Sequence, residues 1–255
     1  MGELKRRISS ILSGFRKLPA DKTLKLVSPS EDIVQKRFPY GVDFGTTAIK
    51  LIQVGIIDGK PQVINLIIEE IPEELLNNPG ERKRALLEIF KRMVKTYKIK
   101  GQVVTSIPSP LAQTGMIRLP NMPHDEIDKA VKWELSQTST IALEDLSFDY
   151  YILDEAEGSS EIKVMVISCS KKDVLEQLAL IQSANLFPVA VEIDSLAIVS
   201  SLIYSSQIKK EEVVLFLDFG YSSCSLNIVV NNQIYLIRHL AINGKSLTHA
   251  ISDHC

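Results

Sequence analysis

Two Asp-Phe-Gly triplets, at residues 43–45 and 218–220, are the part of the sequence whose residue types suit phosphate chemistry. Glycine lets a backbone approach a phosphate closely, and neighbouring N–H groups and hydroxyls can donate hydrogen bonds to it. Asp43 and Asp218 are suited to hold Mg²⁺ through its retained waters, because Mg²⁺ gives up water reluctantly. Lys50 would add a compensating positive charge if its strand position faces the same way. The expected phosphate-binding residues are Gly45, Thr46, Thr47, Lys50, Gly220, Tyr221, Ser222 and Ser223.

Both triplets occupy the same place in a repeated pattern. The apolar run Val213–Leu217 predicts a strand buried on both faces that leads into the second triplet, and 40–44 predicts the strand before the first. After each triplet come a strand, a two-residue turn and another strand. One triplet alone could simply end a strand in a tight turn, but two copies indicate an internal duplication whose hairpins face each other across a cleft. No protein-kinase loop set and no GxxxxGK[ST] loop accompanies them.

Two further carboxylates, Glu192 and Asp194, follow a predicted strand over Val189–Ile193 and begin a predicted helix. A water-activating carboxylate is expected there, near a hinge between two lobes, so both residues are candidates for a catalytic role. The alternative for Asp194 is structural, since an aspartate at a helix start can cap the free N–H groups.

The elements that must position these residues are strands alternating with helices. Asn78 and Glu81 predict a capped helix start, and the apolar face that follows should pack on the first sheet. After a short strand over Val103–Ile107, a strand-helix-strand insertion follows. Its tryptophan, Trp133, is expected to pack in a core. The pattern as a whole is typical of an α/β protein.

Composition resembles that of an ordinary soluble protein and excludes some functions. Of the 255 residues, 45% are apolar and 24% charged, and the formal net charge of −2 gives no global reason to expect nucleic-acid binding. Three cysteines suit a reducing compartment, so a cytoplasmic location is expected. The segment 3–18 predicts a basic amphipathic helix that could lie on an anionic membrane or dock on protein, and 19–37 predicts a linker. No apolar stretch is long enough to cross a bilayer.

The residues around both triplets resemble the phosphate-binding motifs of the actin, Hsp70 and sugar-kinase superfamily. Within it, the sequence is similar to the PilM family of type IV pilus assembly from about Tyr40 onward, including Arg118-Leu119-Pro120 and Asn243–Thr248. The resemblance implies an α/β, bilobed actin-like ATPase (ribonuclease H-like) fold with a small inserted subdomain and an incomplete second lobe. The implied divisions are a basic helix and linker at 1–37, the first part of lobe I at 38–108, the inserted subdomain and return strand at 109–168, the rest of lobe I with the hinge helix at 169–210, and the start of lobe II at 211–255.

The resemblance also implies a function. The ligands would be ATP and Mg²⁺, with at most weak ATPase activity, in a scaffold at the inner face of the cytoplasmic membrane. Its partner would be the cytoplasmic N-terminal tail of an inner-membrane PilN-like protein, held near residues 104–168. The superfamily's adenosine-binding motif lies well beyond the second hairpin, so the 255-residue chain is expected to bind ATP poorly. A small-molecule (sugar or acyl) kinase of the same superfamily is the alternative, and it needs a substrate-positioning base for which the sequence offers no convincing candidate.

Overall fold

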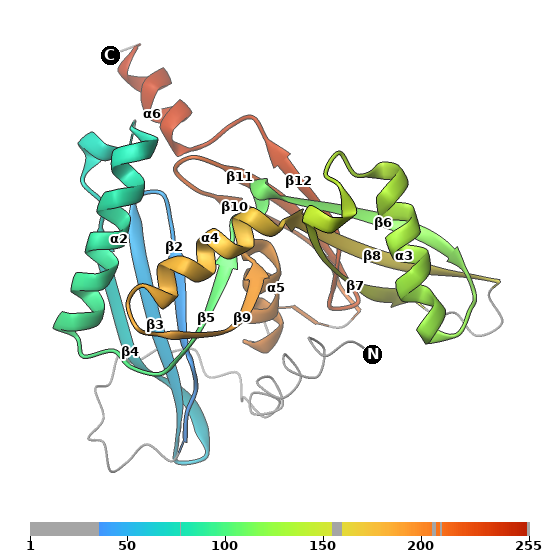
Figure 1. The fold of residues 1–255 in the computed structure, drawn as a ribbon, viewed down its shortest axis with the longest axis horizontal. Helices are drawn as coiled ribbons and strands as arrows, with labels where there is room; N and C mark the ends of the chain where they lie inside the picture. The colour runs from blue at the N-terminus through green and yellow to red at the C-terminus, as the bar shows by residue number, and fades with distance from the viewer. Residues whose placement is uncertain (1–35, 77, 155–159, 206–207, 210, 254–255) are drawn as a thin grey trace.

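A computed structural model describes residues 36–76, 78–154, 160–205, 208–209 and 211–253. The predicted amphipathic helix at 3–18 and most of the predicted linker lie outside them. Three β-sheets carry helices packed against them, and one sheet with its helix projects to the side (Figure 1). The strands are β1 (Lys36–Arg37), β2 (Tyr40–Phe44), β3 (Ala48–Ile57), β4 (Lys60–Glu70), β5 (Gln102–Ile107), β6 (Ala112–Pro120), β7 (Leu146–Asp154), β8 (Glu161–Ser170), β9 (Phe187–Ile193), β10 (Val213–Phe219), β11 (Cys224–Val230) and β12 (Gln233–Leu240). The helices are α2 (Pro79–Thr96), α3 (His124–Thr138), α4 (Lys171–Gln182), α5 (Asp194–Tyr204) and α6 (Gly244–Ser252), with 3-10 turns η2 (Glu73–Leu75), η3 (Ser109–Leu111) and η4 (Leu143–Asp145).

The first sheet combines an antiparallel and a parallel part. Strands β2, β3 and β4 pair antiparallel, whereas β2 pairs parallel with β5, and β5 parallel with β9. Asp58 and Gly59 have positive φ angles of 50° and 71°, which is the predicted two-residue turn between β3 and β4. Parallel strands end at the same edge of a sheet, so the residues that follow β2, β5 and β9 come together there.

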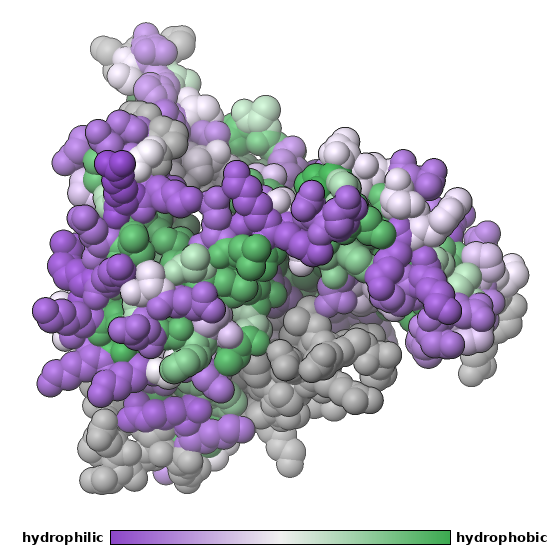
Figure 2. Space-filling model, viewed as in Figure 1, coloured by the Kyte–Doolittle hydropathy of each residue, from purple (hydrophilic) through white to green (hydrophobic). Residues whose placement is uncertain are grey.

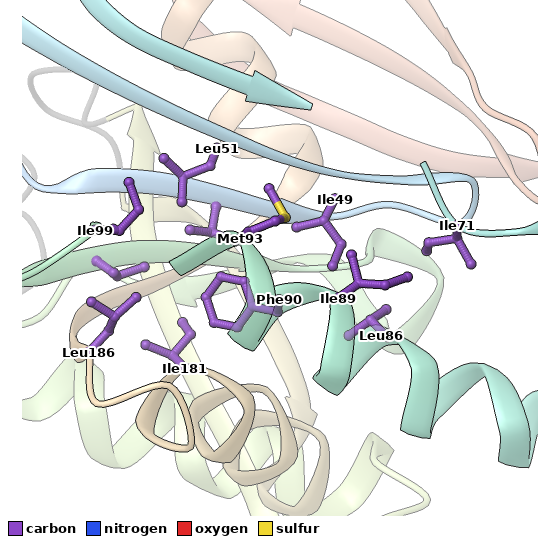
Figure 3. Packing of buried hydrophobic residues seen from close by; sticks show 12 residues of the cluster. Ile49, Leu51, Ile71, Leu86, Ile89, Phe90, Met93, Ile99, Ile181 and Leu186 are labelled. Carbon is purple, nitrogen blue, oxygen red and sulfur yellow. The ribbon is translucent and has the colours of Figure 1, made fainter. Parts of the chain in front are cut away.

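Helices α2 and α4 supply the core of this sheet. The predicted cap is confirmed, since the Asn78 side chain accepts a hydrogen bond from the Glu81 amide at 3.4 Å. Phe90 of α2 is fully buried, and its ring meets that of Phe44 edge-on at a centroid distance of 4.9 Å. Figure 3 shows the side chains of α2 and α4 meeting those of β3 in this cluster. The predicted apolar face of α2 therefore does pack on the sheet.

The projecting unit is the insertion. Its strands have the order β6-β8-β7, and α3 covers one face of them with Ile127, Val131 and Leu135 buried. Trp133 is 65% exposed, so the expectation that it packs in a core is wrong. It lies on the side of α3 opposite those three residues, because a helix repeats every 3.6 residues. The Tyr151 hydroxyl of β7 donates to the Ile234 carbonyl of β12 at 2.7 Å and so ties the insertion to the last sheet.

The last sheet, with the order β10-β11-β12, has one covered face and one open face. Its covered face packs on α5, where Val229 and Ile234 are buried. The open face includes a row along β10 with high exposed fractions, namely Val213 (71%), Leu215 (58%), Leu217 (52%) and Phe219 (44%). The prediction that the run 213–217 is buried on both faces is therefore wrong. An apolar run indicates a strand, but whether both faces are covered depends on what else packs there.

From this open face we expect the chain to associate with copies of itself. Among the described strands β10 pairs only with β11, so it presents both a free strand edge and an apolar row. We expect the chain to form concentration-dependent oligomers in sedimentation velocity, and Leu215→Glu to reduce them. The control is Leu175→Glu on α4, a leucine that is also exposed, at 63%. Equal oligomer formation by Leu215→Glu and the unmodified chain would contradict this explanation.

The rest of the surface is mixed. The face shown in Figure 2 is mostly hydrophilic, with hydrophobic residues gathered around α4. Helix α6 also carries exposed apolar residues, Leu247 at 44% and Ile251 at 64%. None of the helices that the structure describes is both long enough and apolar enough to span a membrane.

Candidate functional site

The first phosphate loop of the site, residues 43–47, consists of the end of β2 and the turn that joins it to β3. A Cβ added to Gly45 would lie 2.9 Å from the carbonyl oxygen of Ala48, closer than real Cβ atoms approach, so the loop can follow this path only with glycine. The Thr47 carbonyl accepts a hydrogen bond from the Ile71 amide at 2.8 Å. These contacts fix the tight backbone path that a phosphate-binding loop needs.

Lys50 faces the same way as Asp43. The two residues lie directly opposite each other in the antiparallel pair of β2 and β3, and opposite residues share one face of a sheet. Lys50 Nζ donates to Asp43 Oδ2 at 3.2 Å. Both side chains are about half exposed (55% and 49%), so this ion pair adds little to stability and leaves both groups accessible to a ligand.

The second loop joins β10 to β11 and is held by the start of α6. The Gly220 amide donates to the Ser223 carbonyl at 2.9 Å, and a Cβ on Gly220 would lie 3.1 Å from the same oxygen. The Gly244 amide donates to the Gly220 carbonyl at 2.9 Å, and Asn243 Nδ2 donates to the Ser222 carbonyl at 3.3 Å. Asn243 and Gly244 thus support the loop, a role that the resemblance of the stretch Asn243–Thr248 did not assign to them.

The two loops meet at their hydroxyl groups. Thr46 Oγ1 and Ser222 Oγ lie 2.5 Å apart and share a hydrogen bond, although the residues are 176 positions apart in the sequence. Both residues had been predicted to bind phosphate, one in each half of the duplication. The structure brings these halves together at one site.

Three carboxylates, those of Asp43, Asp194 and Asp218, lie near enough to one another to interact electrostatically. Burial raises the pKa of Asp194, and the charges of Asp218 and Asp43 add to the rise, against two backbone hydrogen bonds that lower it. Burial and the charge of Asp43 also raise the pKa of Asp218, against the opposing charge of the neighbouring lysine. Negative charges gathered in this way favour a bound cation.

Asp194 is held in place by hydrogen bonds to one oxygen. Its Oδ1 accepts from the Ser109 amide at 3.0 Å, from the Ser109 hydroxyl, and from the Ser195 amide at 2.6 Å. The bond to Ser195 satisfies a free N–H group in the first turn of α5, although the N-cap position itself is occupied by Ile193 rather than Asp194. The bonds to Ser109, which follows β5, also fix the direction of the carboxylate beside the loops. Ser109 was not predicted, because its role depends on the parallel pairing of β5 with β9.

Glu192 has different neighbours from Asp194. Burial, reinforced by the charge of Asp149 on β7, raises the pKa of Glu192 to about 7. The charge of Glu192 in turn adds to the effect of burial in raising the pKa of Tyr151, also on β7. The groups that act on Glu192 thus belong to the inserted unit. The arrangement favours Asp194 over Glu192 as the carboxylate of the phosphate site.

The residues present fit a water-mediated magnesium site. Among the residues that the structure describes, no group of three or more His, Cys, Asp or Glu side chains is placed to hold a metal directly. Mg²⁺ commonly binds through one or two carboxylates, phosphate oxygens and several waters. Asp43 and Asp218, at the two facing loops, suit that mode.

Comparison with known proteins assigns the family. The family model described as type IV pilus assembly protein PilM matches residues 41–255. A chain of the PilM–PilN type IV pilus biogenesis complex is similar at 26% identity and a TM-score of 0.73, over 85% of this chain and 65% of that one. The cytoplasmic domain of EpsL, an inner membrane component of the type II secretion system of Vibrio cholerae, shares the fold at 13% identity and a TM-score of 0.50, over 84% of this chain and 74% of that domain.

The predicted actin-like α/β fold is confirmed by these matches. The chain spans 65% of the length of the PilM–PilN complex chain that it matches. The family match covers both Asp-Phe-Gly loops, the three carboxylates and the inserted unit, and it extends to the last residue, 255. The chain therefore belongs to the PilM family of type IV pilus assembly proteins.

Proposed function

We propose that this chain is a cytoplasmic scaffold of type IV pilus assembly that binds the phosphates of ATP between its two Asp-Phe-Gly loops. The observation that carries the proposal is the meeting of the loops at Thr46 and Ser222, 2.5 Å apart, beside three interacting carboxylates. Membership of the PilM family and the actin-like fold support the same function.

Each residue of the site has a distinct task in this proposal. Gly45 and Gly220 let the backbone approach the phosphates. The groups that donate hydrogen bonds to the phosphates are those of Thr46, Thr47, Lys50, Tyr221, Ser222 and Ser223. Asp43 and Asp218 hold Mg²⁺ through waters, and the ion neutralises phosphate charge when bound. Asp194, with its direction set by Ser109, orients a water and accepts its proton, which gives at most a weak ATPase.

If Asp43 holds Mg²⁺, its replacement should weaken ATP binding only when Mg²⁺ is present. Asp43→Asn should raise the dissociation constant for ATP about tenfold or more in the presence of Mg²⁺ and change it little in EDTA, because a charge-assisted contact contributes about 1.5–3 kcal/mol. NMR titration up to millimolar ATP, with and without Mg²⁺, measures both values. Asp145→Asn, at an exposed position in η4 of the inserted unit, is the matched control. Magnesium-dependent affinity that is unchanged in Asp43→Asn would contradict the assignment.

We also propose a partner, the cytoplasmic N-terminal tail of an inner-membrane PilN-like protein, bound near residues 104–168. The similarity to a chain taken from a PilM–PilN complex supports it. A partner anchored in the membrane would place this chain at the inner face of the cytoplasmic membrane. Strand β7 of the insertion bonds to the last sheet through Tyr151, and its Asp149 lies near enough to Glu192 of the first sheet to affect its pKa. A tail bound to the insertion would therefore lie on the part of the molecule that is next to both sheets.

A binding experiment tests the partner. Isothermal titration of the chain with a synthetic peptide of the PilN cytoplasmic N-terminus, from the same organism, should give saturable one-to-one binding. A scrambled peptide of the same composition is the control and should give no heat of binding. Trp133, the only tryptophan in the chain, lies in the inserted unit and provides a fluorescence signal there. Equal binding of both peptides would count against a specific partner site.

A further inference from the structure

Arg82 of α2 contacts the backbone carbonyls of the first phosphate loop, residues 43–47. Its Nη2 donates to the Gly45 carbonyl at 2.9 Å and to the Thr46 carbonyl at 3.4 Å. Its Nε is buried and has no hydrogen-bond partner among the described residues. Burial lowers the pKa of Arg82, although a guanidinium keeps its charge in proteins. Partial burial of the charged guanidinium costs free energy. The hydrogen bonds of Arg82 to the two loop carbonyls offset this cost and explain why the side chain lies there.

The direction of these carbonyls determines the direction of the amides. A trans peptide is planar, with its C=O and the following N–H pointing to opposite sides, and the described residues contain no cis peptide bond. With the carbonyls of Gly45 and Thr46 drawn toward Arg82, the amides of Thr46 and Thr47 point away from it. The Thr47 carbonyl is fixed separately, by the Ile71 amide next to the pairing of β3 with β4. The amides of Thr46 and Thr47 thus face the side opposite Arg82, as anion-binding loops require.

The charge on Arg82 also strengthens those amides as donors. A hydrogen bond from a cation to a carbonyl polarises the peptide, and the N–H of the same peptide becomes a better donor. Both contacts come from one nitrogen, Nη2, whose two N–H groups have directions fixed by the plane of the guanidinium. A lysine ammonium would keep the charge, but its N–H groups rotate and do not hold two carbonyls in a fixed geometry.

We propose that Arg82 is a positioning residue that sets the anion-binding conformation of the loop at 43–47. This inference rests on the proposed function, because the loop conformation is useful to the protein only if the loop binds phosphate. The orientation of the loop amides can nevertheless be measured without any nucleotide, so the two proposals can fail separately.

The experiment compares the whole chain with Arg82→Gln, Arg82→Lys and Arg82→Ala by NMR. In the nucleotide-free chain, the N–H residual dipolar couplings of Thr46 and Thr47, which report the directions of these bonds, should change in Arg82→Gln, and those of Phe90 and Val103 in the core should not. In titrations with ATP and Mg²⁺, Arg82→Gln and Arg82→Lys should raise the dissociation constant about ten- to a hundredfold. Arg84→Gln, at an exposed arginine two residues further along α2, is the matched control and should behave as the unmodified chain.

Chemical rescue separates positioning from a general loss of structure. Millimolar guanidinium should restore part of the original couplings and part of the affinity in Arg82→Ala, and should leave the unmodified chain unchanged. Couplings and affinity in Arg82→Gln equal to those of the unmodified chain would overturn the inference, as would equally large changes in the couplings of the core amides without rescue. If ATP shifts no loop signal in the unmodified chain, the proposed function fails, and the comparison of couplings still decides the role of Arg82.

Discussion

Replacing Gly45 with valine should weaken the binding of ATP with Mg²⁺ by about a hundredfold, the equivalent of losing two or three hydrogen bonds of about 1 kcal/mol each. A Cβ at this position would lie 2.9 Å from the Ala48 carbonyl and 3.6 Å from Asp43 Oδ2. The obstacle at Ala48 is backbone, which cannot rotate aside as a side chain would. The loop must therefore move, and the amides of Thr46 and Thr47 lose their direction.

The measurement is an NMR titration in which the signals of both phosphate loops are followed. Gly115→Ala is the matched control, because a Cβ at Gly115 of β6 would meet no atom within 4 Å. Gly220→Val should have a smaller effect than Gly45→Val, since its Cβ would approach the Ser223 carbonyl to 3.1 Å, a clash that a small shift relieves. Binding by Gly45→Val at the affinity of the unmodified chain would show that the first loop does not hold phosphate.

Glu192→Gln should stabilise the chain at pH 8 by up to about 3 kcal/mol and have no effect near pH 4. Burial and the charge of Asp149 raise the pKa of Glu192 from 4.5 to about 7. Between these values the folded chain keeps a proton that the unfolded chain has lost, so the free energy of unfolding falls as pH rises from about 4.5 to 7. The loss is complete above pH 7, where Glu192 is charged in both states. Glutamine resembles the protonated acid and removes this dependence.

Thermal unfolding followed by circular dichroism at pH 5, 6, 7 and 8 measures the effect. At pH 8 the melting temperature of Glu192→Gln should exceed that of the unmodified chain by roughly 5–10 °C, and the gap should close toward pH 5. Glu126→Gln, at an exposed position on α3, is the control. A constant gap across this pH range would mean that glutamine acts through packing rather than through the charge.

Much of the first loop could be predicted because its determinants are local. The turn at Asp58 and Gly59 closes the hairpin of β3 and β4, and the triplet at 43–45 marks where β2 ends. The residue pattern alone does not decide the side on which Lys50 lies, and the pairing of β2 with β3 decides it. The duplication implies that the loops of Thr46 and Ser222 form two sides of one site, but it does not imply that their hydroxyls touch.

The groups that support the loops could not be predicted, because they act across long separations in the sequence. Arg82 reaches Gly45 from a helix and Ser109 reaches Asp194 from the turn η3 after β5, and neither residue type marks such a role by itself. The two wrong expectations, burial of Trp133 and burial of both faces of β10, have a common cause. Apolar residues are more often buried than exposed, but whether another helix or strand covers a given one depends on the packing of the whole fold.

In the nucleotide-free site, Thr46 and Ser222 bond to each other, and without this bond their hydroxyls would bond only to water. In this pair one hydroxyl donates and the other keeps its own O–H free, so an arriving phosphate must part the two only if both are to donate to it. The gain from the second bond is then the difference between a charge-assisted bond and a neutral one. Parting them also separates the two halves of the duplication at the point where they touch. Binding of phosphate and separation of the two loops therefore favour each other. Any contact that holds the loops apart competes with the bond between Thr46 and Ser222, and it does not compete with the ligand.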